Sequence, residues 1–161
     1  MKILPENDYQ ILRLTDCFYK DYPIKEYKEL MMKRKRAYNC LLFQTHYEYF
    51  ICIPYRTEIT HENAFLFKKS KRSRKHKSGL DYSKIIIISK LKYLENEQAI
   101  IDQDEFRETM MNLERIKKDA LKFVEDYIHH INGTKILHSA EFKRKYQYTT
   151  LKYFHDEIVK I

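Results

Sequence analysis

The sequence has no tryptophan, only two glycines and three prolines in 161 residues, and no long apolar run. Its three cysteines, Cys17, Cys40 and Cys52, form no CxxC pair and are odd in number, which argues against a disulfide framework or a zinc site. No apolar run approaches the roughly 18 residues of a membrane-spanning helix, and the N-terminus lacks the apolar core of a signal peptide. We therefore expect a cytoplasmic protein without membrane attachment, metal or other cofactor.

The composition is that of a folded protein. Hydrophobic residues make up 43% of the chain and charged residues 34%, with 14 tyrosines and 9 phenylalanines. A chain of this length buries roughly 70% of its unfolded surface, which is enough for one compact core. No internal repeat or linker divides it. We therefore expect a single domain over residues 1–161.

Positive charge is in excess and concentrated. Lysine and arginine number 31 against 23 acidic residues, for a formal charge of +8. A run without an apolar face lies ahead of Gly79, where we expect the chain to bend, and its repelling charges predict a mobile loop. Such a run predicts salt-sensitive phosphate binding, although substrate RNA, inhibitory RNA and simple solubility all remain possible reasons for it. The predicted RNA-binding residues of this run are Lys68, Lys69, Lys71, Arg72, Arg74, Lys75 and Lys77.

The first half of the chain reads as one helix followed by strands. Tyrosine, leucine and methionine at helical spacing predict a short helix within Ile24–Lys35. Asn39–Phe43 and Tyr47–Ile53 are rich in aromatic and branched residues and predict a β-hairpin. Pro54 cannot donate to a strand ladder, so we expect the second strand to stop or bulge there. Tyr82–Ile88 predicts a central strand buried on both faces.

The last third reads as helical. Asp102 or Asp104 is placed to cap a long helix over Glu105–Ile131, whose apolar residues recur every three to four positions. Gly133 follows where a left-handed C-terminal residue is expected. A second helix is predicted over Ser139–Val159. Strands first and helices last predict an α+β domain, a small twisted antiparallel sheet or half-barrel covered by helices.

The segment after Pro54 carries candidate catalytic groups. Arg56 has planar donors that match phosphate oxygens, although a lone arginine is more commonly a solvated surface residue. Thr57 can donate to the same phosphate or bond its own backbone. His61 shares this segment and titrates near neutral pH, so it is the preferred acid or base among seven histidines. This set suits RNA cleavage in which the 2′-hydroxyl is the nucleophile.

Two further residues have both a functional and an ordinary interpretation. Ser78 precedes Gly79 and can place a hydroxyl at the phosphate, or it can simply flank a bend. Tyr55 can stack on an unpaired base, or it can cover the rim of the sheet. We include both in the candidate site.

The order of features from Tyr38 to Ile88 resembles a known family. The stretch YNCLLFQTHYEYFICIPYRTEITHENAFLF followed by SGLDYSKIIII is similar to the toxins of type III toxin–antitoxin systems, within the CptN/TenpN branch related to ToxN and AbiQ. In that family a proline at a strand end precedes hydroxyl and basic residues, and Pro54, Arg56 and Thr57 stand in that place. The ToxN branch carries consecutive hydroxyl residues and then a lysine there. In this chain Arg56 replaces one hydroxyl residue and Ile59 stands near the place of the lysine, so the identity of the general base stays open and His61 is the substitute.

The resemblance implies a barrel like that of the Kid and MazF toxins and a metal-independent endoribonuclease that acts on cellular mRNA. It also implies inhibition by a repeated RNA pseudoknot, which the toxin cuts from a precursor and binds in a protein–RNA hetero-oligomer. From the residues alone, charge supports a second hypothesis, a non-catalytic RNA-binding module.

Overall fold

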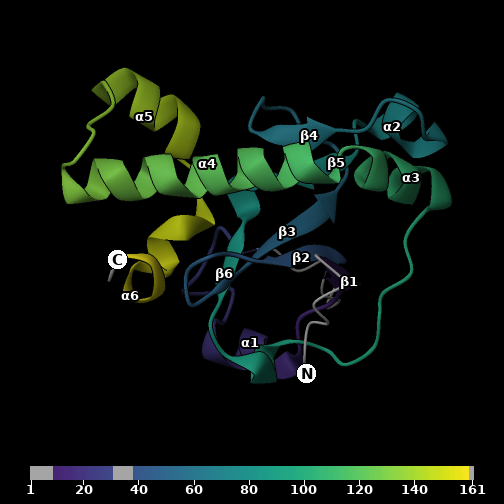
Figure 1. The fold of residues 1–161 in the computed structure, drawn as a ribbon, viewed down its shortest axis with the longest axis horizontal. Coiled ribbons are helices and arrows are strands. Elements are labelled where there is room, and N and C mark those ends of the chain that lie inside the picture. The colour runs from purple at the N-terminus through teal and green to yellow at the C-terminus, as the bar shows by residue number, and fades with distance from the viewer. Residues whose placement is uncertain (1–8, 31–37, 160–161) are drawn as a thin grey trace.

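The computed structural model describes residues 9–30 and 38–159, and these form an α+β fold (Figure 1). The predicted α+β class is therefore confirmed. Within the described residues, six strands pair in antiparallel fashion: β1 (Gln10–Leu12), β2 (Cys40–Gln44), β3 (Phe50–Arg56), β4 (Ala64–Leu66), β5 (Gly79–Asp81) and β6 (Ile86–Ile88). The pairings run β1-β2-β3-β5-β4, with β6 also on β3, and make an open sheet.

Strand β3 is the central strand of the sheet, because it pairs with β2 on one side and with both β6 and β5 on the other. It pairs with β2 from Gln44↔Phe50 to Cys40↔Pro54, so the predicted hairpin is confirmed. On its other side β6 pairs with the first part of β3, ending at Cys52↔Ile86. Strand β5 takes over at Tyr55↔Leu80. The end of β3 thus lies beside β5, which brings residues 56 and 81 near each other.

The expected stop at Pro54 was wrong, because β3 continues through it to Arg56. The amide of Tyr55 donates to the Asn39 carbonyl at 2.8 Å, which makes Pro54 and Cys40 a pair without mutual hydrogen bonds. The missing N–H of Pro54 therefore points to the other side of β3. There the neighbour changes from β6 to β5, so no ladder bond is lost.

Gly79 permits a very close approach of two strands. It pairs with Arg56 on one side and Leu66 on the other. A Cβ atom at Gly79 would lie 2.2 Å from the carbonyl oxygen of Phe65 and 3.0 Å from the Leu66 Cα, both backbone atoms. The predicted bend at this glycine is therefore better described as a point of backbone contact between β4 and β5.

Helices occupy the C-terminal third, as predicted, but in more pieces. Asp102 caps α3, while Asn112 ends it by donating its side-chain amide to the Glu108 carbonyl at 2.8 Å. Gly133 closes α4 with φ of 75°. The helix predicted over 139–159 is broken after Tyr146. The helices are α1 (Asp16–Asp21), α2 (Lys71–His76), α3 (Gln103–Met111), α4 (Leu113–Asn132), α5 (Ser139–Tyr146) and α6 (His155–Ile158), with 3-10 turns η1 (Tyr82–Lys84), η2 (Leu91–Tyr93) and η3 (Thr150–Tyr153).

Two other predictions changed. Ile24–Leu30 forms hydrogen-bonded turns and no helix, and the rest of that predicted helix, to Lys35, lies outside the described residues. The strand predicted over Tyr82–Ile88 divides into η1 and the shorter β6, since Asp81 caps η1 by accepting a hydrogen bond from the Ser83 amide.

Helix α4 crosses the sheet and supplies much of the second layer of the core (Figure 1). Its buried face has the helical spacing expected of an amphipathic element, and α5 packs on it through Tyr146, whose hydroxyl donates to the Phe123 carbonyl at 2.6 Å. The buried residues of α4 are Ile116, Ala120, Phe123, Val124, Tyr127 and Ile128. No helix in the described ranges has the length and apolarity to cross a membrane.

Candidate functional site

The last residue of β3 meets a buried carboxylate on β5. The guanidinium Nη1 of Arg56 donates to Oδ2 of Asp81. The Asp81 side chain is fully buried, and that of Arg56 is 16% exposed. Because a guanidinium has five N–H donors, one bond to Asp81 leaves Arg56 with donors for a second anion.

His61 reaches the same carboxylate from the loop after β3. Its Nε2 lies 3.2 Å from Oδ1 and 3.3 Å from Oδ2 of Asp81. On the other side of the ring, Nδ1 accepts a hydrogen bond from the Asn63 amide at 3.1 Å. That amide fixes the neutral tautomer, with the proton on Nε2 facing Asp81. The structure thus brings Arg56 and His61 together on one carboxylate.

Ser83 completes the environment of Asp81. Its amide and its hydroxyl both donate to Oδ1, at 2.9 Å and 2.6 Å, and its hydroxyl lies 3.3 Å from Nε2 of His61. Burial alone would raise the pKa of Asp81. Hydrogen bonds from His61 and Ser83, with the charge of Arg56, outweigh burial and hold the pKa of Asp81 below its ordinary value.

Lys84 follows Ser83 as the last residue of η1 and adds a second cation to this part of the chain. Its ammonium donates to the Tyr148 carbonyl at 3.0 Å. Burial lowers the pKa of Lys84, and the charge of Asp81 opposes that effect while the charge of Arg56 adds to it. The basic groups and the acid therefore form one electrostatic unit, which we call the Asp81 cluster: Arg56, His61, Asp81, Ser83 and Lys84.

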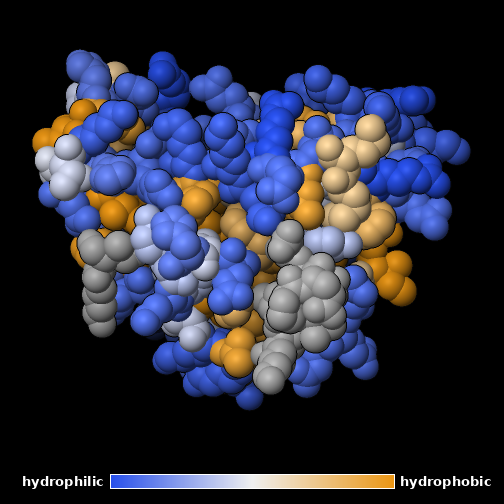
Figure 2. All heavy atoms as spheres, in the orientation of Figure 1, coloured by the Kyte–Doolittle hydropathy of each residue, from blue (hydrophilic) through white to orange (hydrophobic). Residues whose placement is uncertain are grey.

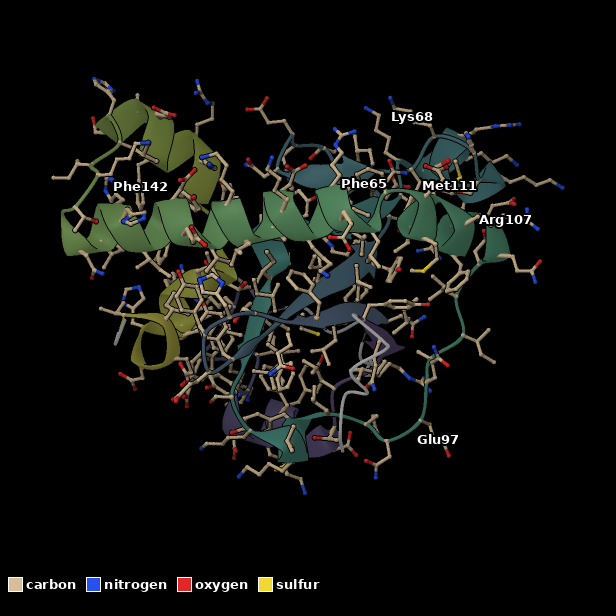
Figure 3. All side chains as sticks on the ribbon, in the orientation of Figure 1. Phe65, Lys68, Glu97, Arg107, Met111 and Phe142 are labelled. Atoms are coloured by element: carbon tan, nitrogen blue, oxygen red, sulfur yellow. The ribbon has the colours of Figure 1, made fainter. Side chains whose placement is uncertain are left out.

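The basic run is partly helical, so the prediction of a mobile loop was wrong. Ser70 caps α2 by accepting a hydrogen bond from the Ser73 amide at 2.9 Å, and Ser73 itself is buried. Lys77 ends the helix with φ of 47°. All seven basic residues predicted to bind RNA are exposed. They cover the α2 end of the molecule, where Figure 2 shows hydrophilic side chains and Figure 3 places Lys68 at the outer edge.

Two carboxylates of α3 hold the basic run in place. Glu108, which is buried, accepts from the Lys68 amide at 3.0 Å and from the Lys69 amide at 2.5 Å. Glu105 lies 3.8 Å from Nε of Arg72. Burial raises the pKa of Glu105 despite the charge of Arg72. Hydrogen bonds from its backbone amides therefore order the basic run. Repulsion between its like-charged side chains does not prevent these bonds.

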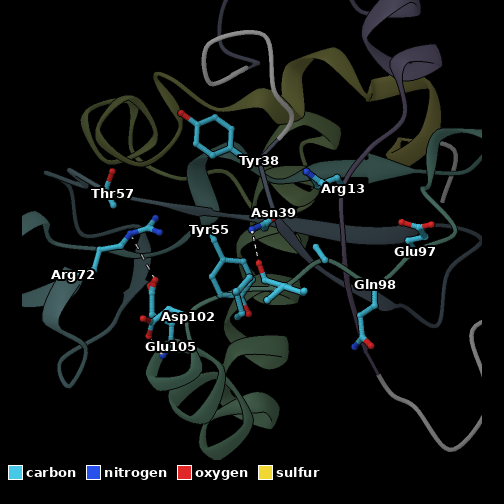
Figure 4. A pocket seen from close by; sticks show the side chains of 13 residues that line it. Arg13, Tyr38, Asn39, Tyr55, Thr57, Arg72, Glu97, Gln98, Asp102 and Glu105 are labelled. Atoms are coloured by element: carbon cyan, nitrogen blue, oxygen red, sulfur yellow. Dashed lines mark hydrogen bonds and ion pairs between the residues drawn. The ribbon is translucent and has the colours of Figure 1, made fainter.

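Thr57 faces away from the Asp81 cluster. It lines a separate polar cavity of about 510 Å³ that also contains Arg13, Asn39, Arg72 and Glu105 (Figure 4). Successive side chains of an extended segment point to opposite faces, and Arg56 and Thr57 follow that rule. The structure therefore separates Thr57 from Arg56 and His61.

Tyr55 and Ser78 are buried and do not fit the roles predicted for them. Tyr55 is 5% exposed, its hydroxyl lies 3.0 Å from that of Thr109, and its ring stacks on Phe67. Phe67 covers one face of that ring, and the side chain forms part of the wall of the cavity that Thr57 lines. Ser78 is fully buried, so its hydroxyl does not reach a phosphate on the surface. We remove both residues from the candidate site.

The sequence prediction did not include Asp81, Ser83 and Lys84. All three lie in the stretch SGLDYSK, where only Ser78 and Gly79 attract attention as single residues. A polar aspartate and serine just before a run of four isoleucines is the signal that could have identified them. Within residues 9–30 and 38–159, no group of three or more metal-binding side chains lies together. Comparisons with family models, curated proteins and solved structures found no match.

Proposed function

We propose that this chain is a metal-independent endoribonuclease, the toxin of a type III toxin–antitoxin system. The observation that carries the proposal is the meeting of Arg56 and His61 on Asp81, beside Lys84 and near in sequence to an exposed basic helix. The resemblance over residues 38–88 supports the same activity. Cellular mRNA is the proposed substrate, the cytoplasm the proposed compartment, and a repeated RNA pseudoknot the proposed inhibitor and partner in a hetero-oligomer.

Cleavage proceeds by attack of the ribose 2′-hydroxyl on the adjacent phosphate, which forms the 2′-O–P bond and breaks the P–O5′ bond. The products are a 2′,3′-cyclic phosphate and a 5′-hydroxyl, whose oxygen takes its proton from solvent water as it leaves. The free donors of Arg56 and the ammonium of Lys84 face the charge that develops on the phosphorane. His61 takes the 2′-hydroxyl proton at Nδ1, the nitrogen whose lone pair now accepts the Asn63 amide. Asp81 contacts the opposite nitrogen and orients the ring. Substrate binding must therefore displace the Asn63 amide.

The barrel of the Kid and MazF toxins is part of this proposal. Support comes from β3, which exchanges β6 for β5 along its length, as strands of a strongly bent sheet do. The exposed residues of α2 and its flanks bind the pseudoknot. Apart from Arg72, which faces Glu105, their side chains are not used to hold the segment, because Glu108 orders it through the backbone amides of Lys68 and Lys69.

The test uses protein freed from RNA, incubated with single-stranded RNA in chelator. Wild type should leave 2′,3′-cyclic phosphate ends, and Arg56→Ala and His61→Ala should each cut at least about 100-fold more slowly. His129→Ala, an exposed histidine at the far end of α4, is the matched control and should cut normally. Intact RNA with wild type, or full activity in both cluster variants, would overturn the proposal.

Arg56→Ala leaves the buried Asp81 without its partner, so a second variant separates folding from activity. Arg56→Gln combined with Asp81→Asn removes both charges and keeps hydrogen-bonding groups in place. If this double variant unfolds like wild type but does not cut RNA, the loss is chemical. Cutting at the wild-type rate would exclude Arg56 from catalysis.

A non-catalytic RNA-binding module is the second candidate. It is favoured by one observation: both ring nitrogens of His61, and one donor of Arg56, already have partners inside the protein. Such contacts are also typical of a purely structural ion network. Expression in a bacterial host discriminates the two, because the enzyme should arrest growth unless its cognate RNA is supplied, while a passive binder should be tolerated.

A further inference from the structure

Tyr148 is an exposed aromatic residue whose backbone contacts the Asp81 cluster. It lies in the turn between α5 and η3, and it is 64% exposed. In the portion of the chain that the structure describes, its ring and hydroxyl make no hydrogen bond or ring contact, whereas its carbonyl holds the ammonium of Lys84 at 3.0 Å. A large ring is thus left in solvent beside a residue of the candidate site.

The turn that carries Tyr148 is fixed to the cluster at several points. The side chain of Asn63, whose amide binds His61, donates to the Lys145 carbonyl at 3.3 Å. The hydroxyl of Thr150 donates to the Ile85 carbonyl. Thr149 is buried and caps η3 by accepting from the Leu151 amide at 3.2 Å. Hydrogen bonds therefore hold the backbone of the turn to the loop that carries His61 and to the segment that carries Lys84. They fix the position of the Tyr148 Cα atom.

The surroundings of this turn suit a polyanion. Lys143 and Arg144 on α5 are exposed, and Lys84 contacts the turn from the sheet side. Helices α5 and α2 lie at opposite ends of α4 (Figure 1), so basic residues are found at both ends of this helix. A nucleic acid that extends along α4 from α2 would meet further cations at this turn.

We propose that Tyr148 is a stacking platform for an unpaired RNA base next to the cleaved phosphate. Tyrosine rings hold unpaired bases without regard to sequence, and because the backbone of this turn is already ordered, base stacking has to order only the side chain. The stacking role that the sequence predicted for the buried Tyr55 passes to this residue. The inference rests on the proposed function, because it requires that RNA reach the Asp81 cluster.

The first experiment uses the absence of tryptophan from the chain. Tyr148→Trp creates a single-tryptophan protein whose fluorescence a stacked base quenches. The probe is a short single-stranded 2′-O-methyl RNA, which the enzyme cannot cut because its 2′-oxygen is blocked. Ile136→Trp, which replaces a 71% exposed residue in the loop before α5, is the matched reporter and should show little quenching. Equal quenching in the two proteins, or none at position 148, would overturn the platform.

The second experiment measures affinity for the same probe. Tyr148→Ala should weaken binding about 5- to 100-fold, while Tyr148→Phe, which keeps the ring, should bind like wild type. Gln147→Ala, an exposed neighbour, is the control. Because stacking releases no counterions, the salt dependence of binding should be the same in Tyr148→Ala and wild type, unlike in variants that lose charge. A changed slope would mean that the turn acts only through charge.

The outcomes separate the two proposals. If wild type cuts RNA but Tyr148→Ala binds and cuts normally, the platform is wrong and the proposed function stands. If Tyr148→Trp is quenched but wild type leaves cleavable RNA intact, RNA binds at the platform and the nuclease proposal fails. If wild type neither binds the probe nor cuts RNA, both are overturned.

Discussion

Arg56 at the end of β3 donates a hydrogen bond to Asp81 at the end of β5, and this bond joins two residues 25 positions apart in the sequence. Because Asp81 also receives His61 and Ser83, one fully buried carboxylate organises the polar groups of the candidate site. A change at Asp81 therefore removes a shared partner from Arg56, His61 and Ser83 at once.

Asp81→Asn should lower the free energy of unfolding by about 3 kcal/mol at neutral pH, because it leaves Arg56 without its buried counter-charge. The pKa of Asp81 is lowered from its ordinary value of 3.8 in the folded state. Its stabilisation is therefore complete above pH 3.8 and is lost as the pH falls through the folded-state pKa. Denaturant unfolding of both proteins at several pH values measures this.

The difference between wild type and Asp81→Asn should accordingly shrink in acid. Asp16→Asn, an exposed aspartate of α1, is the control and should change stability by less than about 0.5 kcal/mol. A difference that stays constant from neutral pH into acid would show that the charge of Asp81 does not stabilise the fold.

Gly79→Ala should destabilise the protein by about 2–3 kcal/mol, because the new methyl group meets backbone atoms of β4 that have no room to move. Gly133→Ala is the matched control. Its Cβ meets nothing within 4 Å, so only the cost of the left-handed conformation, about 1 kcal/mol, is expected. Thermal unfolding compares the two, and equal losses would contradict the close approach at Gly79.

Glu108→Ala should release the start of the basic run. It removes the acceptor for the amides of Lys68 and Lys69, at a cost of about 2–3 kcal/mol. Hydrogen exchange should be faster at those two amides and unchanged in the middle of α4. Glu114→Ala, whose side chain is 81% exposed, should leave the exchange of both amides as in wild type. Unchanged protection in Glu108→Ala would show that other interactions order the run.

Replacing Lys71, Arg74 and Lys75 by glutamine should weaken RNA binding and flatten its salt dependence by about 0.7 unit for each phosphate that the variant no longer neutralises. Arg72 is kept because it faces Glu105. The control replaces Lys20, Lys25 and Lys28, exposed residues in and after α1, which changes net charge equally on a different surface. If the salt dependence flattens equally in both triple variants, net charge rather than α2 governs binding.

The hairpin and the helical final third could be predicted because their signals are local. Alternating aromatic and branched residues favour β2 and β3 in almost any context, and the periodic face of α4 needs only some apolar surface to cover. The break at Asn112 and the passage of β3 through Pro54 were not predictable in the same way. Each depends on which backbone group lies opposite, and local propensity carries no such information.

The candidate site divides along the same line. Arg56 and His61 could be identified together because they lie in one short segment, and residues that are close in sequence are also close in space. Asp81 could not, because only the pairing of β3 with β5 brings it to Arg56. The sequence offered no sign that Tyr55 is buried, since the contact with Thr109 of α3 that buries it joins distant segments.

By itself the sequence determined an α+β chain, a strongly basic segment, and a segment after β3 in which Arg56 and His61 are candidate catalytic groups. Composition and periodicity suffice for these features because each belongs to one continuous stretch of sequence. Only the tertiary structure decided that the turn closes on Asp81, that the basic segment is held by Glu108, and that Tyr148 and not Tyr55 reaches solvent. Those outcomes depend on hydrogen bonds and burial between distant segments, which exist only once the strands have taken their register.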